Sequence, residues 1–217
     1  MTSGWHPLVP ASELRAGENI VAAFAAGTEL ALWRAADGTA QAWQNRCPHR
    51  SVRFTLGQVV GDRLSCAYHG WQYAAGSGQC AAIPAHPAMP APRTVCAKVY
   101  RAAEAAGMVW ARLDGDDAAS PSGDAVPAGW SFCRSLGIEA PASAARTALE
   151  ARGFRADDAW SWRGTLADAA VAALLLDARD DLAFIHLWTE AAPGSAAMAA
   201  IHAETRRLRA DIETRAR

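Results

Sequence analysis

The sequence predicts a mostly β N-terminal part, residues 1–113, and a small α+β module, residues 130–217, joined by a linker, residues 114–129. Short strand-like runs separated by glycine-containing turns fill the first part. The linker DGDDAASPSGDAVPAG is rich in Asp, Ser, Gly and Pro, which is typical of an exposed connection. After it the chain changes to longer alanine-rich segments. At 217 residues, the chain is long enough for one large domain or two small ones.

The first strands are predicted within residues 17–45, in the runs ENIVAAF, ELALWRA and TAQAWQN. Turn signals separate these runs: Gly27 lies after the first, and Asp37-Gly38 lies between the second and third. An Asp-Gly pair favours a tight β-hairpin because both positions tolerate positive φ angles. Further strands are predicted at RLSCAY, VCAKVYRAAE and GMVWARL.

Five elements are predicted in the C-terminal module from capping residues and hydrophobic spacing. Pro141 and Gly153 bracket one helix, Thr165 is the expected N-cap of a second, and apolar residues at helical spacing mark an amphipathic third. The elements are a strand at 131–140, a helix at 141–153, a helix at 165–179, a buried strand at 181–191 and a terminal helix at 195–217.

Composition excludes several classes of protein. Half of the residues are apolar and the formal net charge is −1. The chain therefore lacks the net positive charge that would attract nucleic acid or an anionic membrane. The longest apolar stretch, around 169–176, is too short to span a bilayer, and the N-terminus lacks a signal-peptide pattern. We therefore expect a cytoplasmic protein whose cysteines are thiols or metal ligands. The five cysteines are Cys47, Cys66, Cys80, Cys96 and Cys133.

Two short boxes each pair one cysteine with one histidine: Cys47-x-His49 and Cys66-x-x-His69, sixteen residues apart. Four ligands of these types could form a tetrahedral zinc site, but zinc sites more often use Cys-x2-4-Cys and His-x3-5-His boxes. Two matching mixed boxes suit a two-iron cluster better, because each loop can then give one ligand to each iron. Cys80, Cys96 and Cys133 have no ligand spacing and are expected to be buried small residues or free thiols.

This arrangement resembles the Rieske [2Fe–2S] family, with Cys47-Pro48-His49 as the first box and CAYHG, residues 66–70, as the second. The resemblance is continuous over about residues 5–112, including Trp5-His6-Pro7 and IPAHP at 83–87. It implies antiparallel sheets with a cluster-binding subdomain. It also implies that the two cysteines hold the iron that stays ferric and the two histidines hold the iron that is reduced.

The boxes look most like those of ring-hydroxylating and O-demethylating oxygenases, of the vanillate-demethylase and phthalate-dioxygenase type. The high-potential branch of the family has an additional cysteine in each box and a serine after the second histidine. Val52, Tyr68 and Trp71 occupy those positions here. The resemblance therefore implies a reduction potential near the low end of the Rieske range, about −150 mV. Gly70 is expected to let the backbone approach the cluster, and Trp71 and Tyr73 either shield it or belong to the core.

Such oxygenases continue into a helix-grip domain that binds a mononuclear iron through two histidines and a carboxylate. No two of the remaining histidines here are close in sequence; they are His6, His86, His186 and His202. We expect a core His186 and a surface His202 rather than a triad with Glu190, Glu204 or Asp211, and Asp157-Asp158 in a solvated loop. The module resembles only the opening and closing elements of a helix-grip domain, as if truncated. Mononuclear Fe(II) and catalytic residues are therefore not expected on this chain.

The resulting hypothesis is a Rieske electron-transfer component of an oxygenase system. It would accept single electrons from a flavin/iron–sulfur reductase and pass them to a mononuclear non-haem iron oxygenase subunit acting on aromatic-type substrates. The alternative is an oxygenase in its own right, a hydroxylase or demethylase with an atypical iron site. A redox sensor that keeps the cluster for structure is a third interpretation. The resemblance also implies an oligomer, with a trimer as the expected form, and no nucleic-acid or membrane partner.

Overall fold

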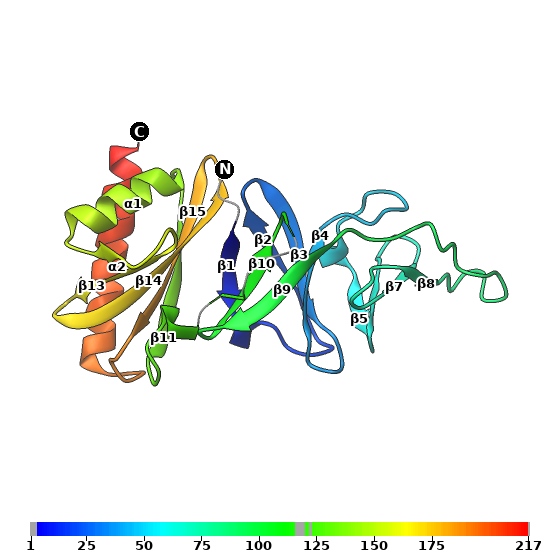
Figure 1. The fold of residues 1–217 in the computed structure, drawn as a ribbon, viewed down its shortest axis with the longest axis horizontal. Helices are drawn as coiled ribbons and strands as arrows, with labels where there is room; N and C mark the ends of the chain where they lie inside the picture. The colour runs from blue at the N-terminus through cyan, green and yellow to red at the C-terminus, as the bar shows by residue number, and fades with distance from the viewer. Residues whose placement is uncertain (1–3, 116–119, 122, 217) are drawn as a thin grey trace.

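Three antiparallel sheets lie in a row in the computed structural model, which describes residues 4–115, 120–121 and 123–216 (Figure 1). A four-stranded sheet is at one end, a six-stranded sheet is in the middle, and a five-stranded sheet covered by two α-helices is at the other end. The expected fold class, an all-β N-terminal part followed by a small α+β module, is confirmed. No helix among the described residues is long and apolar enough to cross a membrane.

The central sheet has the strand order β1-β10-β9-β4-β3-β2. The Asp37-Gly38 hairpin is confirmed: it joins β3 to β4, Gly38 has a φ of 87°, and the Asp37 carboxylate accepts a hydrogen bond of 2.8 Å from the Thr39 amide. Strand β1 was not predicted as a separate strand. The strands are β1 (Trp5–Pro10), β2 (Ile20–Ala25), β3 (Thr28–Arg34), β4 (Ala40–Gln44), β9 (Val99–Ala105) and β10 (Met108–Arg112), and the short helix η1 (Ala11–Glu13) follows β1.

The small sheet is inserted between β4 and β9 and stands away from the rest of the molecule (Figure 1). Its strands are only three residues long, so most of this subdomain is loop. Its own apolar core, built around Phe54, Leu64 and Tyr73, continues into Trp33 and Trp43 of the central sheet. The elements are η2 (Phe54–Leu56), β5 (Gln58–Val60), β6 (Arg63–Ser65), β7 (Gln72–Ala74) and β8 (Cys80–Ala82).

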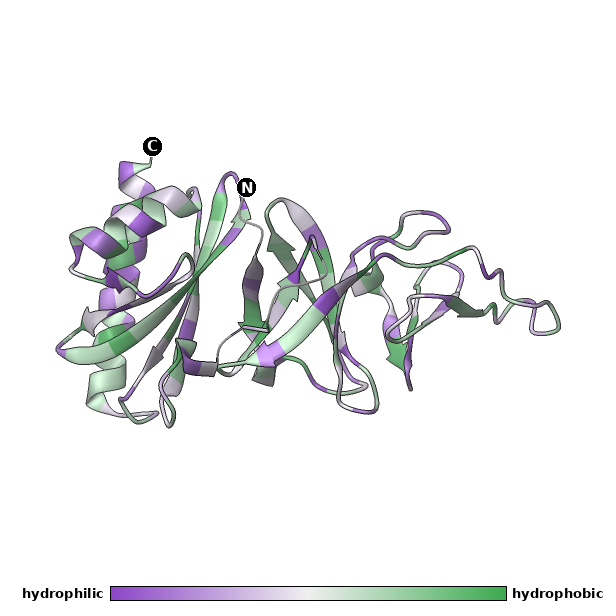
Figure 2. Ribbon diagram, in the orientation of Figure 1, coloured by the Kyte–Doolittle hydropathy of each residue, from purple (hydrophilic) through white to green (hydrophobic). Residues whose placement is uncertain are grey.

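The C-terminal sheet has the order β11-β15-β14-β13-β12, and both α-helices cover the same face of it (Figure 1). Each helix carries hydrophilic and hydrophobic residues along its length, and the apolar ones bury against the sheet (Figure 2). The predicted strands at 131–140 and 181–191 and the helices at 141–153 and 195–217 are confirmed. The elements are β11 (Ser131–Ile138), α1 (Ala142–Ala151), β12 (Arg155–Ala156), β13 (Ser161–Leu166), β14 (Ala169–Arg179), β15 (Leu182–Thr189) and α2 (Ala196–Arg215).

The helix predicted at 165–179 was wrong: this segment is the end of β13, a tight turn, and β14. Ala167 and Asp168 form the turn with φ angles of 49° and 62°, as a two-residue hairpin requires. Along β14, Val171, Ala173 and Leu175 face the helices, while the residues between them face the central sheet. Because both faces are buried, no alternation is visible in the sequence, and the alanine- and leucine-rich run suggests a helix instead.

The C-terminal sheet packs its second face against the central sheet. Leu176 and Ala178 of β14 share a core with Leu8, Val9 and residues of β2. The turn after β2 also donates two backbone hydrogen bonds to the end of β14, from Ala26 and Gly27 to the carbonyls of Asp177 and Ala178, at 2.8 and 2.9 Å.

The predicted linker is not wholly exposed. It carries the short helix η3 (Gly123–Ala125), and Ala125 and Val126 are buried against Trp5 and Met108. Residues 116–119 and 122 of this linker lie outside the described residues. The domain bounds 1–113, 114–129 and 130–217 stay a prediction.

His186, on β15, is buried between the two sheets, as expected, with Nδ1 2.8 Å from Ser135 Oγ. Burial lowers the pKa of His186 from 6.5 to about 4, and the carbonyl of Pro7 partly opposes this shift. Between these two pH values the unfolded chain binds a proton that the folded chain does not, so stability falls as the pH falls through this window. The stability that comes from keeping His186 neutral is fully present above pH 6.5.

We therefore expect His186 to remove about 3 kcal/mol from the free energy of unfolding as the pH falls from about 7 to about 4. Urea unfolding across this range checks the slope, and His186→Gln is expected to flatten it relative to His86→Gln, which alters an exposed histidine. Identical slopes in the two variants would contradict the assignment.

Candidate metal centre

The two Cys/His boxes lie in two loops with the same backbone hydrogen-bond pattern. In the first loop, the Cys47 amide donates to the Val52 carbonyl and the Ser51 amide donates to the Cys47 carbonyl, both at 2.8 Å. In the second, the Cys66 amide donates to Trp71 at 2.9 Å and the Gly70 amide donates to Cys66 at 3.0 Å. Each loop thus closes on its own cysteine, which fixes the direction of both cysteine side chains.

Ser51 and Gly70 occupy equivalent positions in these loops, with φ angles of 58° and 69°. The expectation that Gly70 lets the backbone approach a cluster stays a prediction. A Cβ atom at Gly70 would meet Pro84 only at ordinary contact distances of 3.7 and 3.9 Å. Glycine is favoured there because the loop requires a left-handed backbone conformation.

The structure brings the predicted ligands together as two pairs, Cys47 with Cys66 and His49 with His69. Cys47 and Cys66 are buried, at 2% and 3% exposure, whereas His49 is half-buried and His69 is exposed. The Nδ1 atoms of His49 and His69 face each other at 3.2 Å, and the ring centroids are 4.9 Å apart. Two sulfur donors therefore lie inside the subdomain and two nitrogen donors lie toward its surface. This donor set fits a cluster whose two irons take different ligands.

Aromatic rings hold both imidazoles in place. The Trp71 ring stacks on His49 with centroids 4.0 Å apart and planes within 8°, and the Tyr68 ring stacks on His69 at 3.8 Å. Trp71 is half-buried and also packs against the core of the subdomain. It therefore orients a histidine and belongs to the core at once. Tyr68 is 61% exposed, so its contact is made on the outer surface.

Tyr73 is fully buried, and its hydroxyl lies 3.2 Å from the Cys47 sulfur. Burial raises the pKa of Tyr73 well above its ordinary value, so the hydroxyl keeps its proton. Burial also raises the pKa of the Cys66 thiol. A thiolate in such surroundings needs nearby positive charge, which a bound metal supplies.

Tyr73→Phe is expected to lower the midpoint potential of a bound cluster by a few tens of millivolts. The hydroxyl can donate to a Cys47 thiolate, and this hydrogen bond strengthens as the cluster gains negative charge on reduction. About 1.4 kcal/mol corresponds to ~59 mV for a one-electron couple. A spectroelectrochemical titration measures the shift, with Tyr100→Phe of the central sheet as the control. An unchanged or raised potential in Tyr73→Phe would contradict this role.

Of the other residues singled out from the sequence, Asp157 and Asp158 lie on the C-terminal module, whereas Cys80 packs in the same core as Cys47 and Cys66. Asp158 accepts the amides of Trp160 and Ser161 in a turn, and Asp157 pairs with Arg163 at 2.9 Å, so both lie in an exposed loop, as expected. Among the spare cysteines, Cys80 is buried, Cys96 is exposed and Cys133 is half-buried with a pKa raised by burial to about 11.

The carboxylates considered for an iron triad have other partners. Glu204 pairs with Arg207 at 2.6 Å and with Arg152 at 3.6 Å, and Asp211 pairs with Arg152. The ring of His202 reaches the Cys133 carbonyl at 3.3 Å and is half-buried, not on the surface as expected. Across the described ranges, no group of three or more His, Cys, Asp or Glu side chains is placed to hold one metal ion.

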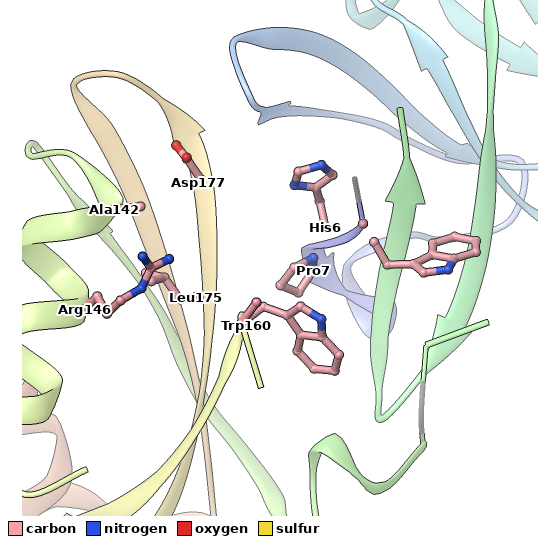
Figure 3. Close-up of a pocket in the computed structure, with 10 residues that line it drawn as sticks. His6, Pro7, Ala142, Arg146, Trp160, Leu175 and Asp177 are labelled. Carbon is pink, nitrogen blue, oxygen red and sulfur yellow. The ribbon is translucent and has the colours of Figure 1, made fainter. Parts of the chain in front are cut away.

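A cavity of about 350 Å³ lies between β1 of the central sheet and the C-terminal module (Figure 3). His6 and Pro7 of β1 line it on one side, and Arg146 of α1 and Asp177 of β14 line it from the module. Burial lowers the pKa of His6, and Asp177 and Asp114 partly oppose this. The sequence gives no signal for this cavity because its walls lie some 140 residues apart along the chain.

Comparison with known proteins agrees with this geometry. Residues 4–99 match the family model of the Rieske [2Fe-2S] domain. The N-terminal part of the chain is therefore a Rieske domain, and its relatives include proteins named as a demethylase and as an oxygenase subunit. The oxidoreductase NdmD of Pseudomonas putida is 38% identical over 109 residues, half of this chain and 18% of that protein. The 3-chlorobenzoate-3,4-dioxygenase oxygenase subunit of Comamonas testosteroni is 34% identical over 111 residues, 51% of this chain and 26% of that protein.

Sequence similarity thus covers less than a third of each of these relatives, whereas similarity of fold extends further. NdmA of Pseudomonas putida superposes with a TM-score of 0.72 at 19% identity, over 98% of this chain and 81% of that one. Dicamba monooxygenase gives a TM-score of 0.74 at 17% identity, over 98% and 87%. The C-terminal module therefore shares the fold of the corresponding parts of these oxygenases.

Proposed function

We propose that this chain is a Rieske electron-transfer component of an oxygenase system, with Cys47, Cys66, His49 and His69 as the ligands of its [2Fe–2S] cluster. The observation that supports it most is the pairing of two buried sulfurs with two imidazoles whose Nδ1 atoms face each other at 3.2 Å. A cluster held by such ligands stores one electron at a higher potential than an all-cysteine cluster does.

Different residues of this chain have different roles in electron transfer. Cys47 and Cys66 anchor the centre inside the subdomain, where Phe54, Leu64 and Tyr73 exclude water. His69 is exposed and His49 is half-buried, so the imidazole edges are the shortest route for an electron between the centre and a docked partner. The stacked rings of Trp71 and Tyr68 keep both edges oriented.

We infer that the oxygen chemistry takes place on another chain. Glu204 and Asp211 are engaged by arginines, and His186 and His202 bond Ser135 and the Cys133 carbonyl. The proposed partners are a flavin or iron–sulfur reductase as donor and a mononuclear iron oxygenase subunit acting on aromatic-type substrates as acceptor. A trimeric assembly that includes this catalytic subunit is part of the proposal.

The fold similarity supports a second candidate, an oxygenase in its own right. The alignment with solved Rieske oxygenases covers 98% of this chain, so it includes the C-terminal module. An atypical iron site on this chain would then complete the activity.

Iron and acid-labile sulfide per chain, measured on anaerobically purified protein, separate the two candidates. We expect two irons and two sulfides, and loss of both in Cys66→Ser but not in Cys96→Ser, which alters an exposed cysteine. Three irons to two sulfides, together with substrate-dependent oxygen uptake by the chain alone, would instead establish the oxygenase. Retention of the cluster in Cys66→Ser would overturn the ligand assignment.

A further inference from the structure

Two unpaired charges and one buried imidazole line the cavity between β1 and the C-terminal module. Arg146 of α1 and Asp177 of β14 are exposed, and neither forms an ion pair with the other or with any residue in the described ranges. His6 of β1, at 7% exposure, lies on the opposite side of the cavity (Figure 3). Elsewhere on the module a neighbouring arginine and carboxylate do pair, as Arg163 and Asp157 do at 2.9 Å. A cation and an anion left open beside one cavity are therefore available to a ligand.

Local structure fixes the walls that carry these charges. Ala142 lies one helical turn before Arg146 on the same face of α1, and its small side chain leaves room beside the guanidinium. Leu175 and Asp177 are two residues apart on β14, so both side chains point to the same face of the sheet. The Asp177 carbonyl accepts a hydrogen bond of 2.8 Å from the Ala26 amide, which ties this end of β14 to the central sheet. The cavity is thus largely preformed, which lowers the entropic cost of binding.

The other lining side chains are apolar and less exposed. Pro7 and Leu175 are buried, and Trp160 is half-buried. The Trp160 ring packs edge-on against Trp110 of β10, with centroids 4.5 Å apart, and the Trp160 carbonyl accepts the Leu175 amide at 2.8 Å. The cavity therefore combines an apolar inner wall with charged groups that face solvent.

The two charges restrict the kind of ligand. A simple anion would pair with Arg146 but would be repelled by Asp177, and a simple cation would meet the reverse. A neutral apolar molecule would use neither charge. A zwitterion satisfies both, because its carboxylate matches the guanidinium and its ammonium matches the aspartate. His6 adds no charge, since burial lowers its pKa from 6.5 and keeps the ring neutral near neutral pH.

We propose that this cavity binds a free α-amino acid with an apolar or aromatic side chain. The ligand carboxylate bonds the Arg146 guanidinium, and the ligand ammonium bonds the Asp177 carboxylate. The ligand side chain packs against Pro7, Leu175 and Trp160. The volume of about 350 Å³ is near the lower limit of small-molecule sites, so it suits a ligand of this size. This binding site is additional to the proposed electron transfer and does not depend on the cluster.

Isothermal titration calorimetry of the holoprotein with L-phenylalanine and L-leucine tests the proposal. We expect saturable binding of one molecule per chain. Two analogues of phenylalanine separate the charged contacts: 3-phenylpropionate lacks the ammonium group, and phenethylamine lacks the carboxylate. Each is expected to bind about tenfold more weakly than phenylalanine or worse, because it leaves one charged side chain without its partner. Equal affinity of either analogue and phenylalanine would show that the site does not recognise a zwitterion.

Two variants locate the site. Arg146→Gln and Asp177→Asn are each expected to weaken phenylalanine binding about tenfold, since each removes one charge-assisted hydrogen bond. Both positions are exposed, so the fold is expected to tolerate these changes. Arg206→Gln, on the exposed side of α2, is the matched control and should bind like the wild type.

Two results would overturn the proposal. Wild-type affinity in Arg146→Gln and Asp177→Asn would place the ligand elsewhere on the chain. Absence of binding by both amino acids up to about 10 mM would show that the cavity is not an amino-acid site. Neither result affects the proposed electron transfer, which the iron and sulfide content decides separately.

Discussion

His69→Cys lowers the midpoint potential of the bound cluster by about 100 mV, roughly half the gap between ~−150 mV for a low-potential Rieske centre and ~−400 mV for an all-cysteine cluster. The substitution replaces a neutral ligand by an anion, which makes the addition of an electron less favourable. The position is exposed, so the smaller side chain disturbs little packing. A redox titration followed by absorbance and EPR measures the shift.

The matched control is His86→Cys, which places a cysteine at an exposed histidine of the same subdomain outside the ligand loops. It is expected to leave the potential unchanged. If His69→Cys keeps its cluster and its wild-type potential, His69 is not a ligand, and the proposed assignment of all four residues falls with it.

Gly57→Ala is expected to destabilise the cluster-binding subdomain by about 3 kcal/mol or more and to reduce the iron content of the purified protein. A Cβ atom at this position would lie 2.0 Å from the backbone oxygen of Ser65, the residue before Cys66. A backbone atom in a strand cannot move aside as the end of a flexible side chain can. The clash therefore displaces either η2 or the strand that leads into the second ligand loop.

Urea unfolding of the purified protein gives the loss of stability, and iron analysis gives the loss of cluster. Gly123→Ala is the matched control, since a Cβ atom there meets nothing within 4 Å and its φ angle is not positive. Wild-type stability and full iron content in Gly57→Ala would show that this close approach does not hold the second ligand loop in place.

The sequence was most informative where a local pattern carries a chemical or conformational requirement. The Asp37-Gly38 turn, the capped helix that became α1, and the two Cys/His boxes depend on neighbouring residues, and each was predicted. The strand at 181–191 was found because its apolar run is bounded by turn residues. These features need no knowledge of what the distant parts of the chain do.

Segments whose character depends on distant partners were missed or misread. The segment now known as β14 was taken for a helix, since its residues are apolar on both faces and only the two layers around it reveal a strand. The burial of Ala125 and Val126 in a stretch with linker composition likewise depends on Trp5 and Met108. Residue types alone do not report such contacts.

The candidate centre shows the same division. The sequence by itself determined the donor types, their pairing in two boxes and the membership of residues 4–99 in a known domain. Only the tertiary structure decided that the Nδ1 atoms of His49 and His69 face each other, that the Tyr73 hydroxyl lies against the Cys47 sulfur, and that the exposed Tyr68 ring stacks on His69. Ligand chemistry is a property of single side chains, so it can be recognised from short stretches of sequence. Distances between side chains arise only when packing brings separate loops together, which is why they had to come from the fold.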